Sequence, residues 1–175
     1  MTIRHARRPD LPAVVTILNE ATARGQNARL APVTVADRAA WFDAHTPEAH
    51  PLWVAEASGE PSESASGGTA SGEIAGWCSV GPWRAGRKAL AATVEISVYV
   101  APERQRQGVG RALVRHALEA APGLGVRTLL AIGLETNAAS LALLSREGFA
   151  RWGSLPRVAE IGGRRVGQWI LGRDV

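Results

Sequence analysis

The sequence has little of several residue types, and each shortage narrows its chemistry. There is one cysteine, Cys78, in 175 residues, which excludes an intramolecular disulfide and a multi-thiolate metal site. This cysteine stands in the apolar segment "IAGWCSV", which predicts a buried and unreactive thiol. The four histidines are scattered without the spacing of metal ligands. We therefore expect no metal and no thiol chemistry.

Long apolar runs are also missing. No stretch reaches the roughly 18 residues that a membrane-spanning helix needs. The opening "MTIRHARRPD" lacks the apolar core of a secretion signal. We expect a cytoplasmic protein that does not bind membranes.

Positive charge is present without being concentrated. The net charge is +4, Lys88 is the single lysine, and the arginines are spread along the chain with no block of like charges. No helix-turn-helix, zinc-finger or RNA-binding signature accompanies them, so we expect no nucleic-acid partner. A modest patch around Arg104, Arg106 and Arg111 favours a smaller polyanion, such as a phosphorylated cofactor.

The length of the chain and its 46% hydrophobic content predict a single domain over residues 1–175. Residues 58–73, "SGEPSESASGGTASGE", cannot bury a core, and we expect them to form a flexible hairpin insertion. Apolar periodicity predicts helices and strands elsewhere. The expected helices cover about 10–25, 34–45, 108–121 and 137–147, and the expected strands lie near 2–6, 52–57, 73–83, 93–100, 127–134, 150–161 and 164–171. This alternation predicts an α/β fold with one mixed central sheet and helices on both faces.

A glycine turn, "PERQRQGVGRAL", joins the expected strand 93–100 to the next helix. Glycines at such a place let consecutive backbone N–H groups reach a phosphate, and the helix dipole adds positive potential. The spacing of Gly108 and Gly110 fits neither a P-loop nor a Rossmann turn, because the lysine of the first and the third glycine of the second are missing. A Q-x-x-G-x-G pattern remains, starting at Gln105.

This pattern resembles the acyl-CoA pyrophosphate loop, [RQ]-x-x-G-x-[GA], of the GNAT superfamily of N-acyltransferases. About thirty residues later, "NAASLALLSREGF" resembles the second signature of that family. The segments "GWCSVGPWR", "VEISVYVAPE" and "VGQW" narrow the resemblance to the branch of phosphinothricin and L-methionine sulfoximine/sulfone acetyltransferases. The likeness covers nearly the whole chain except residues 58–73. It implies the GNAT fold, with a splayed or bulged strand at the cofactor site and acetyl-CoA as co-substrate.

The resemblance also implies the residues that hold the cofactor. The pantetheine arm would pair with the strand, the pyrophosphate would lie on the amides of the turn, and the next helix would complete the site. These residues are Val98, Tyr99 and Val100 on the strand, Gln105, Arg106, Gln107, Gly108, Val109, Gly110 and Arg111 in the turn, and Asn137, Ser140 and Arg146 on the helix.

Acetyl transfer to an amine needs a base, since such an amine is mostly protonated at neutral pH. Glu95 stands among apolar residues of the strand, where burying a carboxylate is costly without a role, and the matching glutamate of the family is the general base. Two positions depart from the branch. Ile96 replaces a frequent histidine, and Leu144 replaces a frequent Tyr or His near the CoA sulfur.

The expected acceptor is the free amine of a small amino-acid-like molecule, acetylated by direct transfer. Trp83 and Trp169 could wall its pocket or form a subunit interface, and members of the branch are commonly homodimers. The apolar closing segment "VGQWIL" fits such an interface. Two alternatives remain open. One is an acetyltransferase for a peptide N-terminus, a lysine or a polyamine, and the other is a non-catalytic acyl-CoA-binding module.

Overall fold

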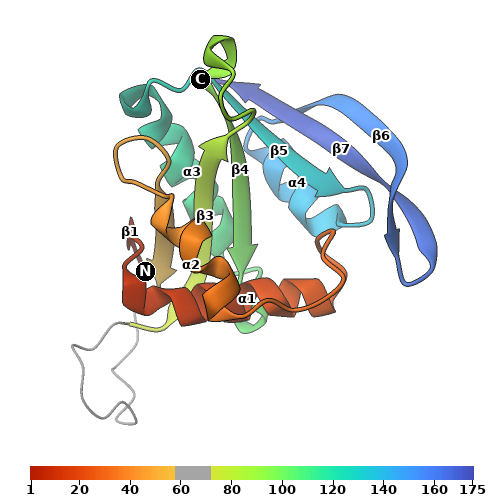
Figure 1. The fold of residues 1–175 in the computed structure, drawn as a ribbon, viewed down its shortest axis with the longest axis horizontal. Coiled ribbons are helices and arrows are strands. Elements are labelled where there is room, and N and C mark those ends of the chain that lie inside the picture. The colour runs from red at the N-terminus through yellow and green to blue at the C-terminus, as the bar shows by residue number, and fades with distance from the viewer. Residues whose placement is uncertain (58–71) are drawn as a thin grey trace.

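The computed structural model describes residues 1–57 and 72–175. Most of the insertion expected over 58–73 therefore lies outside the described residues. Seven strands of the described chain form one sheet in the order β1-β2-β3-β4-β5-β7-β6 (Figure 1). The strands are β1 Thr2–His5, β2 Leu52–Glu56, β3 Ile74–Pro82, β4 Thr93–Val100, β5 Thr128–Leu134, β6 Ala150–Ile161 and β7 Arg164–Asp174. The helices are α1 Leu11–Ala23, α2 Val35–Asp43, α3 Val109–Ala120 and α4 Ala138–Arg146.

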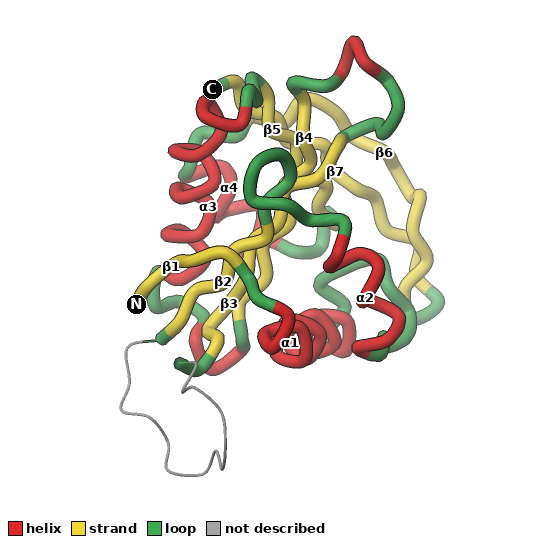
Figure 2. The backbone as a smooth tube through the Cα atoms, turned by 60° about the vertical axis from the view of Figure 1, so that its left-hand side comes forward, coloured by secondary structure: helices red, strands yellow, loops and turns green. Residues whose placement is uncertain are grey.

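The sheet is mixed, as the alternation of strands and helices predicts. Its neighbouring strands run antiparallel except for β4 and β5, which run parallel. Helices α3 and α4 lie on one side of the sheet and α1 and α2 on the other (Figure 2). The predicted α/β fold with helices on both faces is therefore confirmed.

Each face of the sheet has its own core. On the α3/α4 side, Leu113, Leu129 and Leu171 are almost completely buried in one cluster with Cys78. On the α1/α2 side, the fully buried Trp77 donates a hydrogen bond of 3.1 Å from Nε1 to the carbonyl of Val14 in α1. Burial raises the pKa of the Cys78 thiol well above its ordinary value, so the thiol stays protonated, as an unreactive core residue should.

Strands β4 and β5 pair over a short length only. Their parallel register covers Thr93 to Glu95 of β4 against Thr128 to Leu130 of β5. Beyond this point β4 continues beside β3, whereas β5 continues beside β7, and the two strands diverge (Figure 1). The expected splay is present, and it opens the middle of the sheet just after Glu95.

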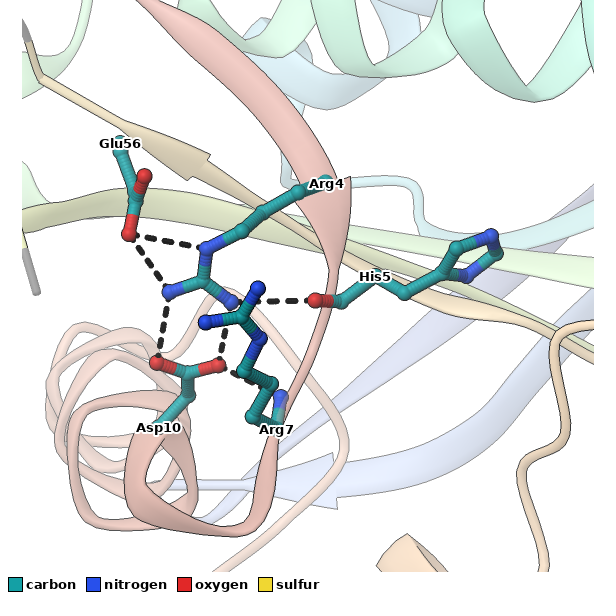
Figure 3. A network of polar contacts seen from close by, with 5 residues as sticks. All are labelled: Arg4, His5, Arg7, Asp10 and Glu56. Atoms are coloured by element: carbon teal, nitrogen blue, oxygen red, sulfur yellow. Dashed lines mark hydrogen bonds and ion pairs between the residues drawn. The ribbon is translucent and has the colours of Figure 1, made fainter.

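A charged network fixes the start of α1 against the sheet (Figure 3). Arg4 of β1 binds Asp10 through both terminal nitrogens, at 2.7 and 3.0 Å, and also binds Glu56 at the end of β2. Burial alone would raise the pKa of Asp10. The hydrogen bonds from Arg4 and from the amide of Arg7 outweigh that effect and hold the pKa below its usual value. The network therefore joins β1, β2 and α1.

The closing strands differ from expectation in their exposure. The segment 166–171 belongs to β7, which lies between β5 and β6 and is largely covered. The exposed large apolar side chains of this region are on the edge strand β6, at Trp152, Leu155 and Val158. None of the described helices is long and apolar enough to cross a membrane.

Candidate active site

Glu95 lies where β4 and β5 part. Its register partners are Gly81 on β3 and Leu130 on β5, and residues directly opposite each other share a face of the sheet. Tyr99 is on the same face of β4 and stacks on Trp77, with ring centroids 4.6 Å apart, so this is the α1/α2 face. A Cβ atom on Gly81 would meet nothing within 4 Å. The carboxylate of Glu95 therefore stands beside open space.

The electrostatic setting of Glu95 suits a proton acceptor. Its carboxylate is half-buried, and among the described residues it has neither a hydrogen bond nor an ion pair. Burial raises its pKa above the ordinary value for glutamate. A carboxylate with a raised pKa binds a proton more strongly, which brings it closer to the range in which a general base works best.

Past Glu95, β4 directs part of its backbone into the splay. The amide of Ala101 donates to the carbonyl of Ala75, at 2.9 Å, and hydrogen-bonded residues alternate along an antiparallel pair. The backbone groups of Ile96, Val98 and Val100 therefore point away from β3. The amide of Ile96 still pairs with Leu130 of β5, whereas Val98 and Val100 lie beyond the register of these two strands and face the side that β5 has left. The backbone of Tyr99 faces β3 instead, so its expected place among the free groups is wrong.

The turn after β4 presents unpaired amides. Gly108 caps α3 in the left-handed conformation, with φ of 85°, and Arg106 has a φ of 62°. In the part of the chain that the structure describes, no acceptor is hydrogen-bonded to the N–H groups of residues 106–111. These groups stand at the positive end of the dipole of α3, where an anion is favoured. The turn can therefore hold a phosphate group.

The two glycines of the turn serve different purposes. At Gly108 the positive φ requires glycine, while an added Cβ would stand in open space. At Gly110 a Cβ would lie 3.0 Å from Cδ2 of Leu143 in α4 and 3.4 Å from Cγ2 of Val100. Gly108 shapes the anion site, whereas Gly110 lets α3 approach α4 and β4.

Both glutamines of the turn brace its backbone. Nε2 of Gln105 donates to the carbonyl of Val100, at 3.2 Å, and Nε2 of Gln107 donates to the carbonyl of Glu103, at 2.8 Å. Their side chains therefore hold the shape of the turn, and its amides remain available. The side chain of Arg106 is exposed beside them.

The helix after β5 carries the second signature. The carboxamide oxygen of Asn137 accepts a hydrogen bond of 3.2 Å from the amide of Ser140, and its nitrogen donates to the carbonyl of Gln26, at 2.9 Å. Asn137 thus begins α4 and ties it to the loop after α1. Arg146 lies at the exposed end of α4, in a groove of about 720 Å³ that also includes Arg115. Glu95 is not part of that groove.

A buried carboxylate in this region was not foreseen from the sequence. Glu147 is only 5% exposed and binds Arg111 at 2.8 Å and Arg115 at 2.9 Å, both on α3. The hydrogen bond from Arg115 lowers the pKa of Glu147, followed by that from Arg111, and the carbonyl of Glu147 accepts from Arg173 on β7. The side chain of Arg111 therefore fixes α3 to α4. The sequence offered no spacing that would distinguish Glu147 from a solvated helix residue.

The two tryptophans expected near the acceptor lie on opposite faces. Trp83 pairs with Thr93 through a hydrogen bond of 3.3 Å and so shares the face of Glu95. Trp169 is paired with Gly133 and packs against the core on the α3/α4 side, under the guanidinium of Arg151 at 4.6 Å. The register of Trp169 therefore places it on the face opposite Glu95 and Trp83, which argues against a pocket that both tryptophans wall. The alternative, a subunit interface, stays a prediction.

Leu144 is 5% exposed and belongs to the core beneath α3 and α4. It can exchange no proton, as its side chain predicts.

Among the described residues there is no group of three or more His, Cys, Asp and Glu side chains that could hold a metal ion. Glu95 and the unpaired edge lie on β4, and the amide-lined turn follows this strand directly. These three features therefore follow one another along the chain.

Comparisons with known proteins agree with this geometry. A model of the acetyltransferase (GNAT) family matches residues 30–149. The chain is 40% identical to "Putative phosphinothricin acetyltransferase YwnH" of Bacillus subtilis, over all of this chain and 99% of that protein. It is 34% identical to the L-methionine sulfoximine/L-methionine sulfone acetyltransferase of Pseudomonas paraeruginosa, over 97% of this chain and 89% of that protein.

A solved structure shares the fold. The phosphinothricin acetyltransferase of Sinorhizobium meliloti, in complex with AcCoA, superimposes with a TM-score of 0.85 at 26% sequence identity. The match covers 99% of this chain and 88% of that one.

Proposed function

The chain belongs to the acetyltransferase (GNAT) family and is an acyltransferase, and from this premise we propose that it transfers acetyl from acetyl-CoA to the free amine of a small amino-acid-like acceptor. The observation that carries the proposal is the free edge of β4, which leads from Glu95 directly into the amide-lined turn before α3. Residues 1–175 would act as one domain.

The cofactor half of the site matches the parts of acetyl-CoA. The pantetheine arm carries amide groups, which can pair with the backbone of Val98 and Val100 in the place of a neighbouring strand. The amides of residues 106–111 would receive the pyrophosphate. This arrangement brings the thioester to the start of the splay, beside Glu95.

Glu95 would act as the general base in a direct transfer. It takes a proton from the acceptor ammonium, directly or through a water molecule, and the neutral amine attacks the thioester carbon. A C–N bond forms, the nitrogen loses its second proton to water, the C–S bond breaks, and CoA leaves as a thiolate. Because Leu144 lies in the core, the thiolate would receive its proton from water, which its ordinary pKa near 8.5 allows.

A homodimer in the cytoplasm completes the proposal. The exposed apolar side chains of β6, Trp152, Leu155 and Val158, support a contact between subunits. A monomeric mass by light scattering at micromolar concentration would contradict it.

The transfer itself is tested by binding and turnover. Isothermal titration should show acetyl-CoA binding, and a thiol-release assay should then rank L-methionine sulfone, L-phosphinothricin, spermidine and a short peptide as acceptors. We expect the amino acids to be acetylated fastest. Binding without release of thiol for any amine would identify a non-catalytic module, and preference for the peptide or polyamine would overturn the acceptor class.

A further inference from the structure

Two arginines near the face of Glu95 have no acidic partner. Arg38 is in α2, and Arg29 is in the loop between α1 and α2. Among the described residues neither guanidinium makes a hydrogen bond or an ion pair, and the Nε atom of Arg38 is buried without an acceptor. A buried donor without an acceptor costs free energy and calls for an explanation.

Apart from Glu95, which faces the same side of the sheet, other covered charges of the described residues are paired. Arg4 lies between Asp10 and Glu56, and the buried Glu147 lies between two arginines of α3. Each of these side chains therefore has an oppositely charged partner. Arg38 differs from them because it has none.

A row of aromatic rings connects Arg38 to the strand that carries Glu95. The guanidinium of Arg38 lies 3.7 Å from the ring centre of Trp41, Trp41 contacts Trp77 at 5.7 Å, and Trp77 stacks on Tyr99 of β4. Stacking holds the guanidinium flat and limits its freedom. The capping box between Thr34 and Asp37 fixes the first turn of α2, and with it the position of Arg38.

The loop before α2 brings Arg29 to the same place. The side chain of Asn27 lies near Tyr99 and lowers the pKa of the phenol, and its oxygen accepts a hydrogen bond of 3.0 Å from the amide of Arg29. Burial raises the pKa of Tyr99, Arg29 and Arg38 lower it, and Glu95 raises it. The phenol is thus within electrostatic reach of both arginines and of Glu95.

Tyr99 therefore has two positive charges and one negative charge within electrostatic reach. Burial lowers the pKa of Arg38, and the neighbouring positive charge of Arg29 lowers it further. Two like charges without a counter-ion repel each other, and an anion between them would relieve that repulsion. Glu95 would repel the same anion and attract an ammonium group.

We propose that Arg38, together with Arg29 and the Tyr99 hydroxyl, binds an oxyanion of the acceptor while its amine faces Glu95. The acceptor is then an amino acid that binds as a zwitterion, with its negative group at the arginines. This assignment rests on the proposed function and specifies its substrate class. Arg38 is expected to contribute most, because its guanidinium is stacked and partly desolvated.

Binding tests the assignment without requiring turnover. Titrations would use the full chain with CoA present and four probes: L-methionine sulfone, L-phosphinothricin and the α-carboxamide of each. The variants are Arg38→Gln and, as a matched control, Arg24→Gln, since Arg24 is exposed at the end of α1. Loss of a charged partner from a desolvated pair predicts at least about tenfold weaker binding of the acid in Arg38→Gln. Arg24→Gln and the affinity for CoA should not change.

The two acids separate the possible sources of the oxyanion. If the arginines hold the α-carboxylate, wild-type protein prefers both acids to their carboxamides, and Arg38→Gln removes that preference. If they hold the distal group, L-phosphinothricin and its carboxamide both depend on Arg38, whereas L-methionine sulfone does not.

Other results overturn the proposal. These are no binding of any probe, binding that is unchanged in Arg38→Gln, or an equal loss of affinity for CoA, which would indicate a general defect. The same experiments distinguish failure of this assignment from failure of the proposed function. Selective, Arg38-dependent binding without acetyl transfer would refute the activity alone, and transfer that is indifferent to the acid group would refute this assignment alone.

Discussion

The two halves of the site are built from different parts of the chain. On the cofactor side, the backbone of β4 and the turn before α3 offers N–H and C=O groups, while Gln105 and Gln107 turn inward to brace it. On the proposed acceptor side, Glu95 and Tyr99 of β4 and Arg38 of α2 offer side chains from two segments of the fold. The difference indicates how a substitution would affect each half of the site. A backbone site binds the same cofactor for many sequences, whereas a side-chain site changes its ligand with one substitution.

The largest effect should come from the acceptor side. Glu95→Gln keeps the shape and removes proton acceptance, so the rate at neutral pH should fall by roughly 10². Raising the pH should restore part of it, because more of the amine is then neutral. The acid limb of the wild-type pH profile should lie above the ordinary pKa of glutamate and vanish in the variant.

The thermal stability of the Glu95→Gln variant should not fall, in contrast to its rate. A raised pKa in the folded state means that this carboxyl group favours folding most below its unfolded pKa and loses that contribution as the pH rises through the folded value. At pH 7 the neutral variant should melt at the same or a higher temperature. Glu160→Gln, on the exposed edge strand, is the control. Near-full activity of Glu95→Gln at pH 7 would place the base elsewhere.

On the cofactor side, one methyl group at two glycines separates conformation from packing. Gly108→Ala forces a side chain into a left-handed φ of 85° and disturbs the amides, so affinity for acetyl-CoA should fall about tenfold. Gly110→Ala points its methyl group at Leu143, 3.0 Å away. It should lower the melting temperature and leave the affinity within about threefold. Equal losses of affinity by titration would refute the distinction.

How much of the site the sequence predicts follows from the same division. The conformation of the turn was predictable because a turn whose amides face a ligand needs glycine at a fixed spacing, and Gly108 has the left-handed conformation. Its anion-binding role stays a prediction. Arg38 was not predictable, because a lone arginine on a helix has a partner or lacks one only after the fold brings Trp41 and Tyr99 together.

Register explains why the orientations of Tyr99 and Trp169 could not be predicted. Periodicity identified the strands and helices, with α4 and β4 close to their expected bounds. The hydrogen-bonding direction of Tyr99 depends on its partner Trp77, and the face of Trp169 depends on its partner Gly133. Neither pairing is written in the local sequence, since a shift of one residue exchanges the two faces.

A smaller effect, on the unfolding free energy, should come from the charged network that joins β1, β2 and α1. Asp10→Asn removes the charged partner of Arg4 and should cost about 1–3 kcal/mol of unfolding free energy at pH 7. Because the folded state lowers the pKa of Asp10, its contribution is present above the unfolded value and is lost as the pH falls through the folded one. Denaturant titrations at pH 7 and below pH 4 measure both quantities.

The exposed ion pair of Arg8 and Asp43 provides the comparison. Asp43→Asn should change the unfolding free energy by less than about 1 kcal/mol. An equal cost for both variants would mean that the network in Figure 3 contributes no more than a surface pair.

The smallest effect on rate should come from Leu144→Tyr. The thiolate can leave without an acid from the protein, so the rate should change by less than about threefold, although the larger side chain in a packed core should cost about 1–3 kcal/mol of stability. Steady-state rates and thermal melts of the same preparation check both. A tenfold gain in rate would show that protonation of the leaving group limits the enzyme.

The divergence of β4 and β5 has a consequence for the resistance of the protein to proteolysis. Without its cofactor the sheet has an open edge in its middle, and the amides of Val98 and Val100 should exchange rapidly with deuterium. A ligand that binds only the folded chain adds about 2.7 kcal/mol when its concentration is 100 times its dissociation constant. The supply of acetyl-CoA would then set how much of this protein survives proteolysis, so that a starved cell would lose the enzyme as well as its substrate.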